Sequence, residues 1–133
     1  MTPVLDMIGL VASDMKATLA FYRLLGLDFP TEDDGPYVEV ATRGGLRISI
    51  NDLTMIKSME PDWIQPVGQR IGLAFLCDGP AGVNAKYAEM LSAGHPSHKA
   101  PWDAFWGQRY AQVIDPDGNI VDLFAPLEDQ APN

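Results

Sequence analysis

The chain has 133 residues, of which 47% are hydrophobic, and a formal net charge of -9 at pH 7. This length suits one domain with a real core, and the acidic balance argues against nucleic-acid binding because phosphates would be repelled. The single cysteine, Cys77, excludes an intrachain disulfide and favours a reducing compartment. No basic leader and no apolar run near the ~20 residues that span a bilayer stand out. We therefore expect a cytoplasmic protein with no membrane partner and no nucleic-acid partner, whose acidic surface permits a cationic ligand.

The first half of the chain predicts a strand, a helix and a hairpin. Asp14 is a good N-cap residue because its side-chain oxygen can accept from free backbone N–H groups. Gly26 suits the left-handed conformation that ends a helix. The segments expected in chain order are a strand over 7–12, a helix over about 15–25, an acidic turn over 32–36 and hairpin strands over 37–41 and 46–50.

The second half repeats this order after an excursion over 52–69, where prolines and a glycine discourage regular structure. Gly94 again follows the predicted helix. The segments expected in chain order are a strand over 71–77, a helix over 81–93, a strand over 110–114, a tight turn over 115–119, a last strand over 120–124 and a polar, frayed tail over 128–133.

The two halves echo each other in sequence. Ile8-Gly9-Leu10 opens the first half and Ile71-Gly72-Leu73 opens the second. A repeat that occurs only twice indicates two halves of one domain and not an array. The order is β-α-β-β-β twice, with a weak signal for the third strand in both halves. The connections after each helix are too short for parallel crossovers, so the sheets should be mixed or antiparallel.

Several motifs resemble those of one known superfamily. They are Asp14 with Phe21-Tyr22 and Leu25-Gly26-Leu27 in the first half, and Trp106-Gly107-Gln108-Arg109-Tyr110 with the run from Asp115 to Leu123 in the second. This pattern is similar to the vicinal-oxygen-chelate superfamily of glyoxalases, bleomycin resistance proteins and extradiol dioxygenases. The resemblance implies an α+β fold in a single domain over 1–133. Two βαβββ modules, over about 4–51 and 70–126, would form curled mixed sheets around a cleft.

Metal-using members of this superfamily place ligands on the first and last strands of each half. Carried over to this chain, those positions hold Met7, Ser49, Arg70 and Asp122. Only Asp122 is a good ligand, and arginine has no lone pair to give. We therefore expect no metal and no other cofactor. Arg70 and Asp122 are candidates for an ion pair, either as a structural replacement for the metal or as a hook for a polar ligand.

Aromatic residues supply the remaining site candidates. Trp102, Phe105 and Trp106 fall within five residues, with Tyr110 close behind, and Trp63 lies in the excursion. Exposing the large apolar ring of a loop tryptophan to water is unfavourable. Such residues therefore either bind a ligand or cover the core, a sheet edge or a dimer interface. Aromatic walls in an acidic protein suit a planar or cationic organic molecule.

Several functions stay open at this level. The first is a metal-free protein that binds a small planar or cationic molecule, in antibiotic or metabolite resistance. The alternatives are a metal-dependent lyase, isomerase or dioxygenase, and a metal-independent enzyme with Asp122 or Glu39 as general base, where Glu39 alternates with apolar neighbours and could face the cleft. A further alternative is a vestigial domain retained for oligomerisation. The resemblance also implies a homodimer.

Overall fold

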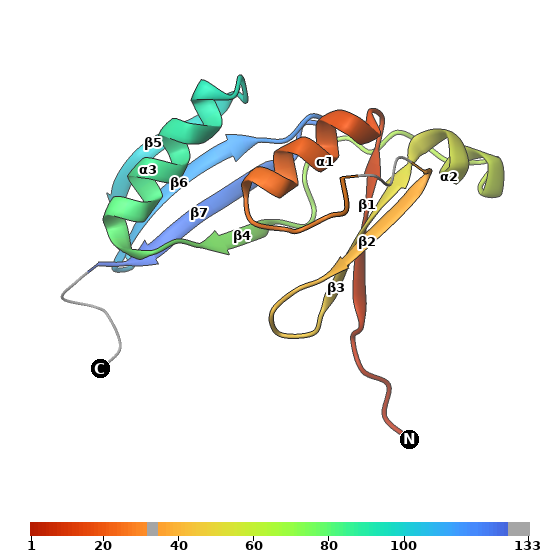
Figure 1. Cartoon of the computed structure of the whole chain (residues 1–133), viewed down its shortest axis with the longest axis horizontal. Coiled ribbons are helices and arrows are strands. Elements are labelled where there is room, and N and C mark those ends of the chain that lie inside the picture. The colour runs from red at the N-terminus through yellow and green to blue at the C-terminus, as the bar shows by residue number, and fades with distance from the viewer. Residues whose placement is uncertain (32–34, 128–133) are drawn as a thin grey trace. The chain divides into compact units, whose positions relative to one another are not determined.

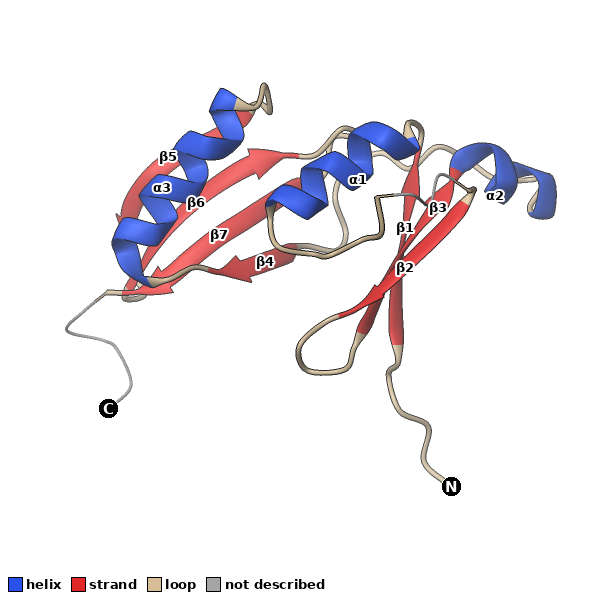
Figure 2. Cartoon of the chain, in the orientation of Figure 1, coloured by secondary structure: helices blue, strands red, loops and turns tan. Residues whose placement is uncertain are grey.

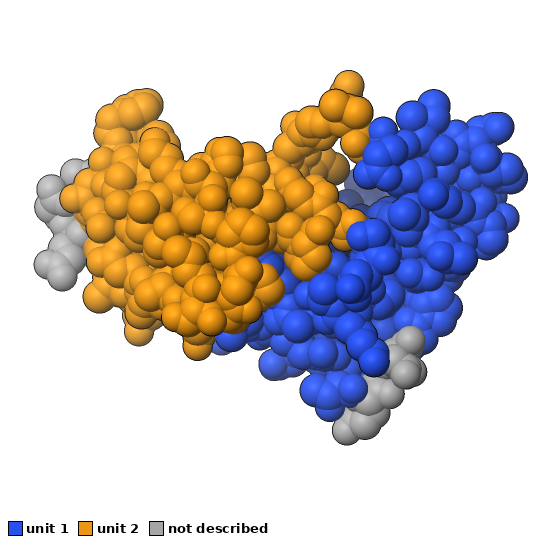
Figure 3. All heavy atoms as spheres, turned by 90° about the horizontal axis from the view of Figure 1, so that it is seen from above, with its two compact units in different colours: residues 1–65 blue, residues 66–133 orange. Residues whose placement is uncertain are grey.

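The computed structural model describes residues 1–31 and 35–127. The chain divides into two compact units, Met1–Gln65 and Pro66–Asn133, which are coloured separately in Figure 3 and are described one at a time below. Part of the expected acidic turn falls on residues 32–34 and the expected polar tail on residues 128–133, and these residues lie outside the described ones.

Unit 1 contains a three-stranded mixed sheet and two helices (Figures 1 and 2). The sheet has the order β1-β3-β2, with β1 parallel and β2 antiparallel to β3. Its elements are β1 (Met7–Ala12), α1 (Met15–Leu24), β2 (Tyr37–Ala41), β3 (Arg47–Asp52) and α2 (Leu53–Met59).

Helix α1 begins and ends where its sequence predicts. The Asp14 carboxylate accepts from the backbone N–H of Ala17 at 3.1 Å, which satisfies one of the free donors of the first turn. Gly26 has φ 99°, a conformation that disfavours residues with a side chain. The helix buries Phe21 and Tyr22 completely, and it lies against β3.

Helix α2 was not predicted, because its residues were assigned to an irregular excursion over 52–69. The helix ends at Met59, before the first proline of that stretch at Pro61. Its seven residues contain no glycine and no proline, so nothing in their backbone opposes a helix. The excursion is therefore irregular only in its later part.

Unit 2 is a four-stranded mixed sheet with one helix (Figure 1). The sheet has the order β4-β7-β6-β5; β4 is parallel to β7, and the other neighbours are antiparallel. Its elements are β4 (Leu73–Leu76), α3 (Gly79–Ser92), β5 (Ser97–Ala104), β6 (Gln108–Ile114) and β7 (Ile120–Pro126).

One face of the unit 2 sheet forms the core with α3, which runs across β5, β6 and β7 (Figure 1). Successive residues of a strand point to opposite faces, so burial alternates along β6 and β7. The fully buried side chains are Val83 and Met90 of α3 together with Ala111, Val113, Val121, Leu123 and Ala125 of the sheet. The intervening residues of β6 and β7 therefore lie on the face away from α3.

Strand β5 was predicted only as a weak third-strand signal, and its one aromatic residue, Trp102, was assigned to a loop. It pairs with β6 over its length, with register shifts between Ser97 and Lys99 and between Lys99 and Trp102. β5 is an edge strand, where Pro101 is tolerated because its missing N–H breaks no central ladder. The residues of this segment have little intrinsic preference for a strand, so its strand conformation depends on pairing with β6.

Within the described residues unit 1 has three strands, whereas the expected βαβββ module has four. The predicted α+β class with two mixed sheets is confirmed.

The sequence echo between the two halves does not match the strand register. Gly9 pairs with Ser49 in unit 1, whereas Ala74 pairs with Asp122 in unit 2. If Ser49 and Asp122 correspond, Gly9 corresponds to Ala74 and not to Gly72.

No helix in the described part of the chain combines the length and apolarity needed to cross a bilayer.

Candidate ligand-binding site

The face of the unit 2 sheet away from α3 carries an aromatic cluster. Tyr110 of β6 lies opposite Trp102 of β5 and Phe124 of β7 in the strand register. The Tyr110 ring centroid is 5.5 Å from that of Trp102, 5.3 Å from that of Trp106 and 6.1 Å from that of Phe124. Edge-to-face contacts of this kind add to the stability that area burial alone provides. Tyr110 is the centre of the cluster, because its ring contacts all three of the other rings.

The same tyrosine connects the aromatic cluster to a carboxylate. Its hydroxyl donates to Asp122 Oδ2 at 2.9 Å, and Gln112 Nε2 donates to Asp122 Oδ1 at 2.9 Å. All three side chains are half-buried. Each carboxylate oxygen of Asp122 therefore accepts one hydrogen bond from the protein. Together the two hydrogen bonds fix the orientation of the carboxylate.

Tyr110 stays protonated well beyond neutral pH. Burial, with help from the hydrogen bond to Asp122 and the charge of that carboxylate, raises the pKa of Tyr110 to about 12. The phenol is therefore a hydrogen-bond donor at every physiological pH, and Asp122 accepts from it. The stability that this arrangement provides is present below pH ~10, where free tyrosine is protonated, and is lost as pH rises from there toward about 12.

We expect this tyrosine to ionise late. An ultraviolet titration of tyrosinate absorbance should show a late component near pH 12 that Tyr110→Phe removes. Tyr37 should also ionise late, since loss of solvation and then the Glu39 carboxylate raise its pKa. A Tyr110→Phe protein with an unchanged titration curve would contradict the hydrogen bond to Asp122.

Three further contacts border this cluster. The Lys99 ammonium lies over the Trp102 ring, 3.9 Å from the centroid, which is a cation–π contact. Phe105 is 97% exposed at the turn between β5 and β6, and its ring contacts Trp106 edge-to-face at 5.0 Å. The Trp106 indole N–H donates to Gln108 Oε1 at 2.9 Å, which fixes the ring orientation. The face therefore already holds one cation against one of its rings.

In unit 1, one face of the sheet carries a polar network around the predicted site residues Met7, Glu39 and Ser49. The Tyr37 hydroxyl lies 3.0 Å from Glu39 Oε2 and 3.2 Å from Met7 Sδ. Arg47 Nη1 donates to Glu39 Oε2 at 2.5 Å and forms an ion pair there. Because the Glu39 carboxylate already forms an ion pair with Arg47 and accepts from Tyr37, it is poorly placed as a general base.

Ser49 is buried at 1% exposure in the same face. Its Oγ accepts from Asn51 Nδ2 at 3.1 Å, and that amide also donates to the Leu10 carbonyl at 3.2 Å. A Cβ at Gly9 would come 3.2 Å from Ser49 Oγ and 3.3 Å from Asn51 Nδ2. Glycine at position 9 therefore leaves room for the Asn51 amide to reach the Leu10 carbonyl of β1.

The structure does not join Arg70 to Asp122. Arg70 is exposed and precedes β4 by three residues, and Ala74 is the residue opposite Asp122 on that strand. Among the residues that the structure describes, no ion pair links Arg70 to Asp122, whose carboxylate is taken by Tyr110 and Gln112. Trp63 lies in unit 1, 5.7 Å from the Lys57 ammonium. Of the predicted site residues, the structure brings together Trp102, Phe105, Trp106, Tyr110 and Asp122 in one unit, and Met7, Glu39 and Ser49 in the other.

The superfamily positions for metal ligands do not fit a metal. Met7 and Ser49 offer a thioether and a hydroxyl, which bind divalent ions weakly, and Ser49 already accepts from Asn51. The strand register makes Gly72, and not Arg70, the counterpart of Met7, and glycine has no side-chain donor atom. In the described part of the chain, no three histidine, cysteine, aspartate or glutamate side chains come together as a metal-binding group. Asp122 is left as the one good donor among these positions.

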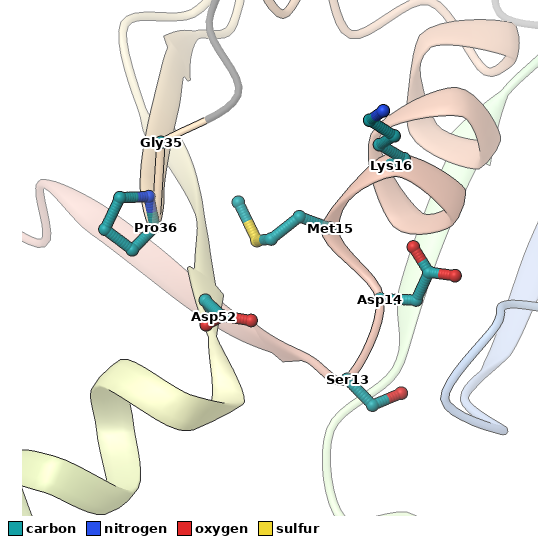
Figure 4. Close-up of a pocket in the computed structure, with 7 residues that line it drawn as sticks. All are labelled: Ser13, Asp14, Met15, Lys16, Gly35, Pro36 and Asp52. Carbon is teal, nitrogen blue, oxygen red and sulfur yellow. The ribbon is translucent and has the colours of Figure 1, made fainter.

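An open depression of ≈ 540 Å³ lies at the start of α1 in unit 1 (Figure 4). The Met15 side chain projects into it toward Pro36, while the Asp14 carboxylate points away. Asp14 is occupied as the helix cap. The described lining residues are Ser13, Asp14, Met15, Lys16, Gly35, Pro36 and Asp52. This depression has no aromatic ring and no matched set of polar groups, so the unit 2 face is the better site.

Sequence reasoning missed three residues of the unit 2 face, namely Lys99, Gln112 and Phe124. The signal for two of them was present. Gln112 lies two residues after Tyr110, and Phe124 two residues after Asp122, so alternation along each strand places both on the same face. Lys99 could not be found in this way, because it reaches Trp102 through the register shift in β5.

Comparison of the sequence with protein families finds a match over most of the chain. The family model of the glyoxalase/bleomycin resistance protein/dioxygenase superfamily matches residues 4–123. The chain belongs to this superfamily. No curated protein matches its sequence significantly.

Solved structures of the superfamily share the fold. A glyoxalase/bleomycin resistance protein/dioxygenase family enzyme from Burkholderia phytofirmans PsJN is 21% identical, with a TM-score of 0.80 over 92% of this chain and 98% of that one. A glyoxalase-related enzyme from Fulvimarina pelagi is 17% identical, with a TM-score of 0.79 over 99% and 96%. A lactoylglutathione lyase from Agrobacterium tumefaciens is 20% identical, with a TM-score of 0.66 over 93% and 94%. At these identities the likeness concerns the fold and not the reaction.

Proposed function

We propose that this superfamily member binds a small planar organic cation on the aromatic face of unit 2 and sequesters it, as in resistance to an antibiotic or a toxic metabolite. One observation carries the proposal. Tyr110 contacts three aromatic rings and donates a hydrogen bond to Asp122, so a stacking surface and a carboxylate adjoin each other. A flat cation needs both features.

The charges of the chain support a cation and not an anion. The formal net charge of -9 raises the local concentration of cations. The contact of Lys99 with Trp102 supports the same preference, because an ammonium lies over the face of this ring. The weak donors at the superfamily metal positions favour binding without a metal over metal-assisted catalysis.

Isothermal titration calorimetry with two planar probes tests the proposal. Proflavine, a planar tricyclic cation, should bind saturably with one molecule per chain, and naphthalene-2-sulfonate, a planar anion, should give no saturable heat. Raising the salt concentration should weaken proflavine binding, since part of the attraction is between exposed charges. Equal binding of the two probes, or no binding of proflavine, would contradict the proposal.

A further inference from the structure

We infer that the cationic group of the ligand carries N–H donors in a plane, as in an amidinium or guanidinium, and is not a quaternary ammonium. This inference rests on the proposed function and narrows its ligand class. It follows from how Asp122 is held, because that carboxylate is the charged acceptor of the aromatic face.

The Asp122 carboxylate is fixed in orientation. Tyr110 donates to one oxygen and Gln112 to the other, each at 2.9 Å. These donors come from alternate residues of β6, on the same face as Asp122 of β7, with Gln112 directly opposite it in the register. Rotation of the carboxylate would break both hydrogen bonds at once, so its plane is set before any ligand arrives.

The carboxylate still has room to accept. An ionised carboxylate offers about four lone-pair positions, of which Tyr110 and Gln112 use two. Within the described residues, no other side chain donates to Asp122. The unused positions lie in the plane of a fixed carboxylate. Two parallel N–H donors in one plane match such a group, whereas a quaternary ammonium has no N–H and gains only the Coulomb attraction.

The aromatic rings suit the same shape of ligand. Tyr110 and Phe124 are tilted by 30° with centroids 6.1 Å apart, and Trp102 stands at 60° to Tyr110. A flat aryl cation can lie along a ring and direct its donors at the neighbouring carboxylate. A tetrahedral ammonium with bulky substituents cannot approach both groups as closely.

The test compares three probes of similar size: benzamidine, phenyltrimethylammonium and benzamide. In calorimetric titrations benzamidine should bind about tenfold or more tightly than phenyltrimethylammonium, because hydrogen bonds to a charged group are worth that much. Benzamide, which is planar and neutral, should bind more weakly still. The ranking is measured on the unaltered protein, so it does not depend on whether a variant folds.

Variants then assign the preference to Asp122. Asp122→Asn removes the charge and should abolish most of the difference between the two cations. Tyr110→Phe keeps the ring but releases one carboxylate oxygen, and it should reduce that difference severalfold. Tyr87→Phe is the matched control, because the Tyr87 hydroxyl bonds to Ser97 on the helix side of the sheet, and this variant should bind as the unaltered protein does.

The outcomes separate the inference from the proposed function. Equal affinity for benzamidine and phenyltrimethylammonium overturns the inference and leaves a cation-binding face intact. A benzamidine preference that Asp122→Asn leaves unchanged also overturns it. No saturable binding of either cation overturns the inference together with the proposed function.

Discussion

Replacing Trp102 and Trp106 together by leucine should weaken proflavine binding by about tenfold or more, since stacking of one aromatic ligand on one side-chain ring is worth ~1–3 kcal/mol. Both rings contact Tyr110, at 5.5 Å and 5.3 Å between centroids, so their loss removes two walls of the surface that we propose for the ligand. Calorimetry on the double variant and on each single variant measures the effect.

The matched control for this pair is Trp63→Leu, the same substitution in unit 1. It should leave the affinity for proflavine within a factor of about two, the scatter expected for substitutions away from the contact. If Trp63→Leu weakens binding as much as the double variant does, the ligand surface does not belong to unit 2 alone and the proposal must be revised. Retained affinity in the double variant would contradict it outright.

Asp115→Ala should lower the free energy of unfolding by about 2–4 kcal/mol, because it removes several hydrogen bonds to a buried charged acceptor. The Asp115 carboxylate is only 4% exposed and accepts from the backbone N–H groups of Asp117 and Asn119 at 2.9 Å each. It also accepts from the Asn119 amide at 2.8 Å. Urea unfolding followed by circular dichroism measures the loss.

Asp115→Asn provides a graded control for that variant. The side-chain amide of the variant keeps one oxygen that can accept from the two backbone N–H groups. It lacks the second carboxylate oxygen, which in the unaltered protein accepts from the Asn119 side chain. Its loss of stability should therefore fall between those of the unaltered protein and Asp115→Ala. If both variants lie within about 0.5 kcal/mol of the unaltered protein, as ordinary surface substitutions do, the carboxylate does not organise this turn.

The closing turn shows how far sequence could predict the fold. Pro116 and Gly118 correctly predicted a tight reversal, and Gly118 has φ 88°. The buried role of Asp115 was not predicted, because turn propensities describe the backbone of a residue and not the partners of its side chain. Local signals likewise predicted the ends of α1 and α3 at Gly26 and Gly94, which have φ 99° and 95°.

Strand β5 marks the limit of that approach. Its residues include a proline and several polar side chains, and its strand conformation depends on pairing with β6, which no local pattern encodes. The assignment of Arg70 failed for a related reason. A three-residue echo in sequence was taken as structural equivalence, whereas the register of β4 against β7 differs from it by two residues.

The candidate site was predicted in part. Tyr110 and Asp122 were both named from the sequence, but their hydrogen bond depends on the antiparallel register of β6 and β7, which pairs Tyr110 with Phe124 and Gln112 with Asp122. That register brings the aromatic residues and the carboxylate to one face. Once it is known, the partners of Asp122 follow from alternation.

The most direct test of the proposed site is a proton–nitrogen correlation spectrum of the three tryptophan indole N–H groups during a titration with proflavine. The Trp102 and Trp106 signals should shift together and saturate at one proflavine per chain, and the Trp63 signal should stay in place. Saturable shifts confined to Trp63, or no shift of any indole at saturating proflavine, would contradict a planar cation bound on the aromatic face of unit 2.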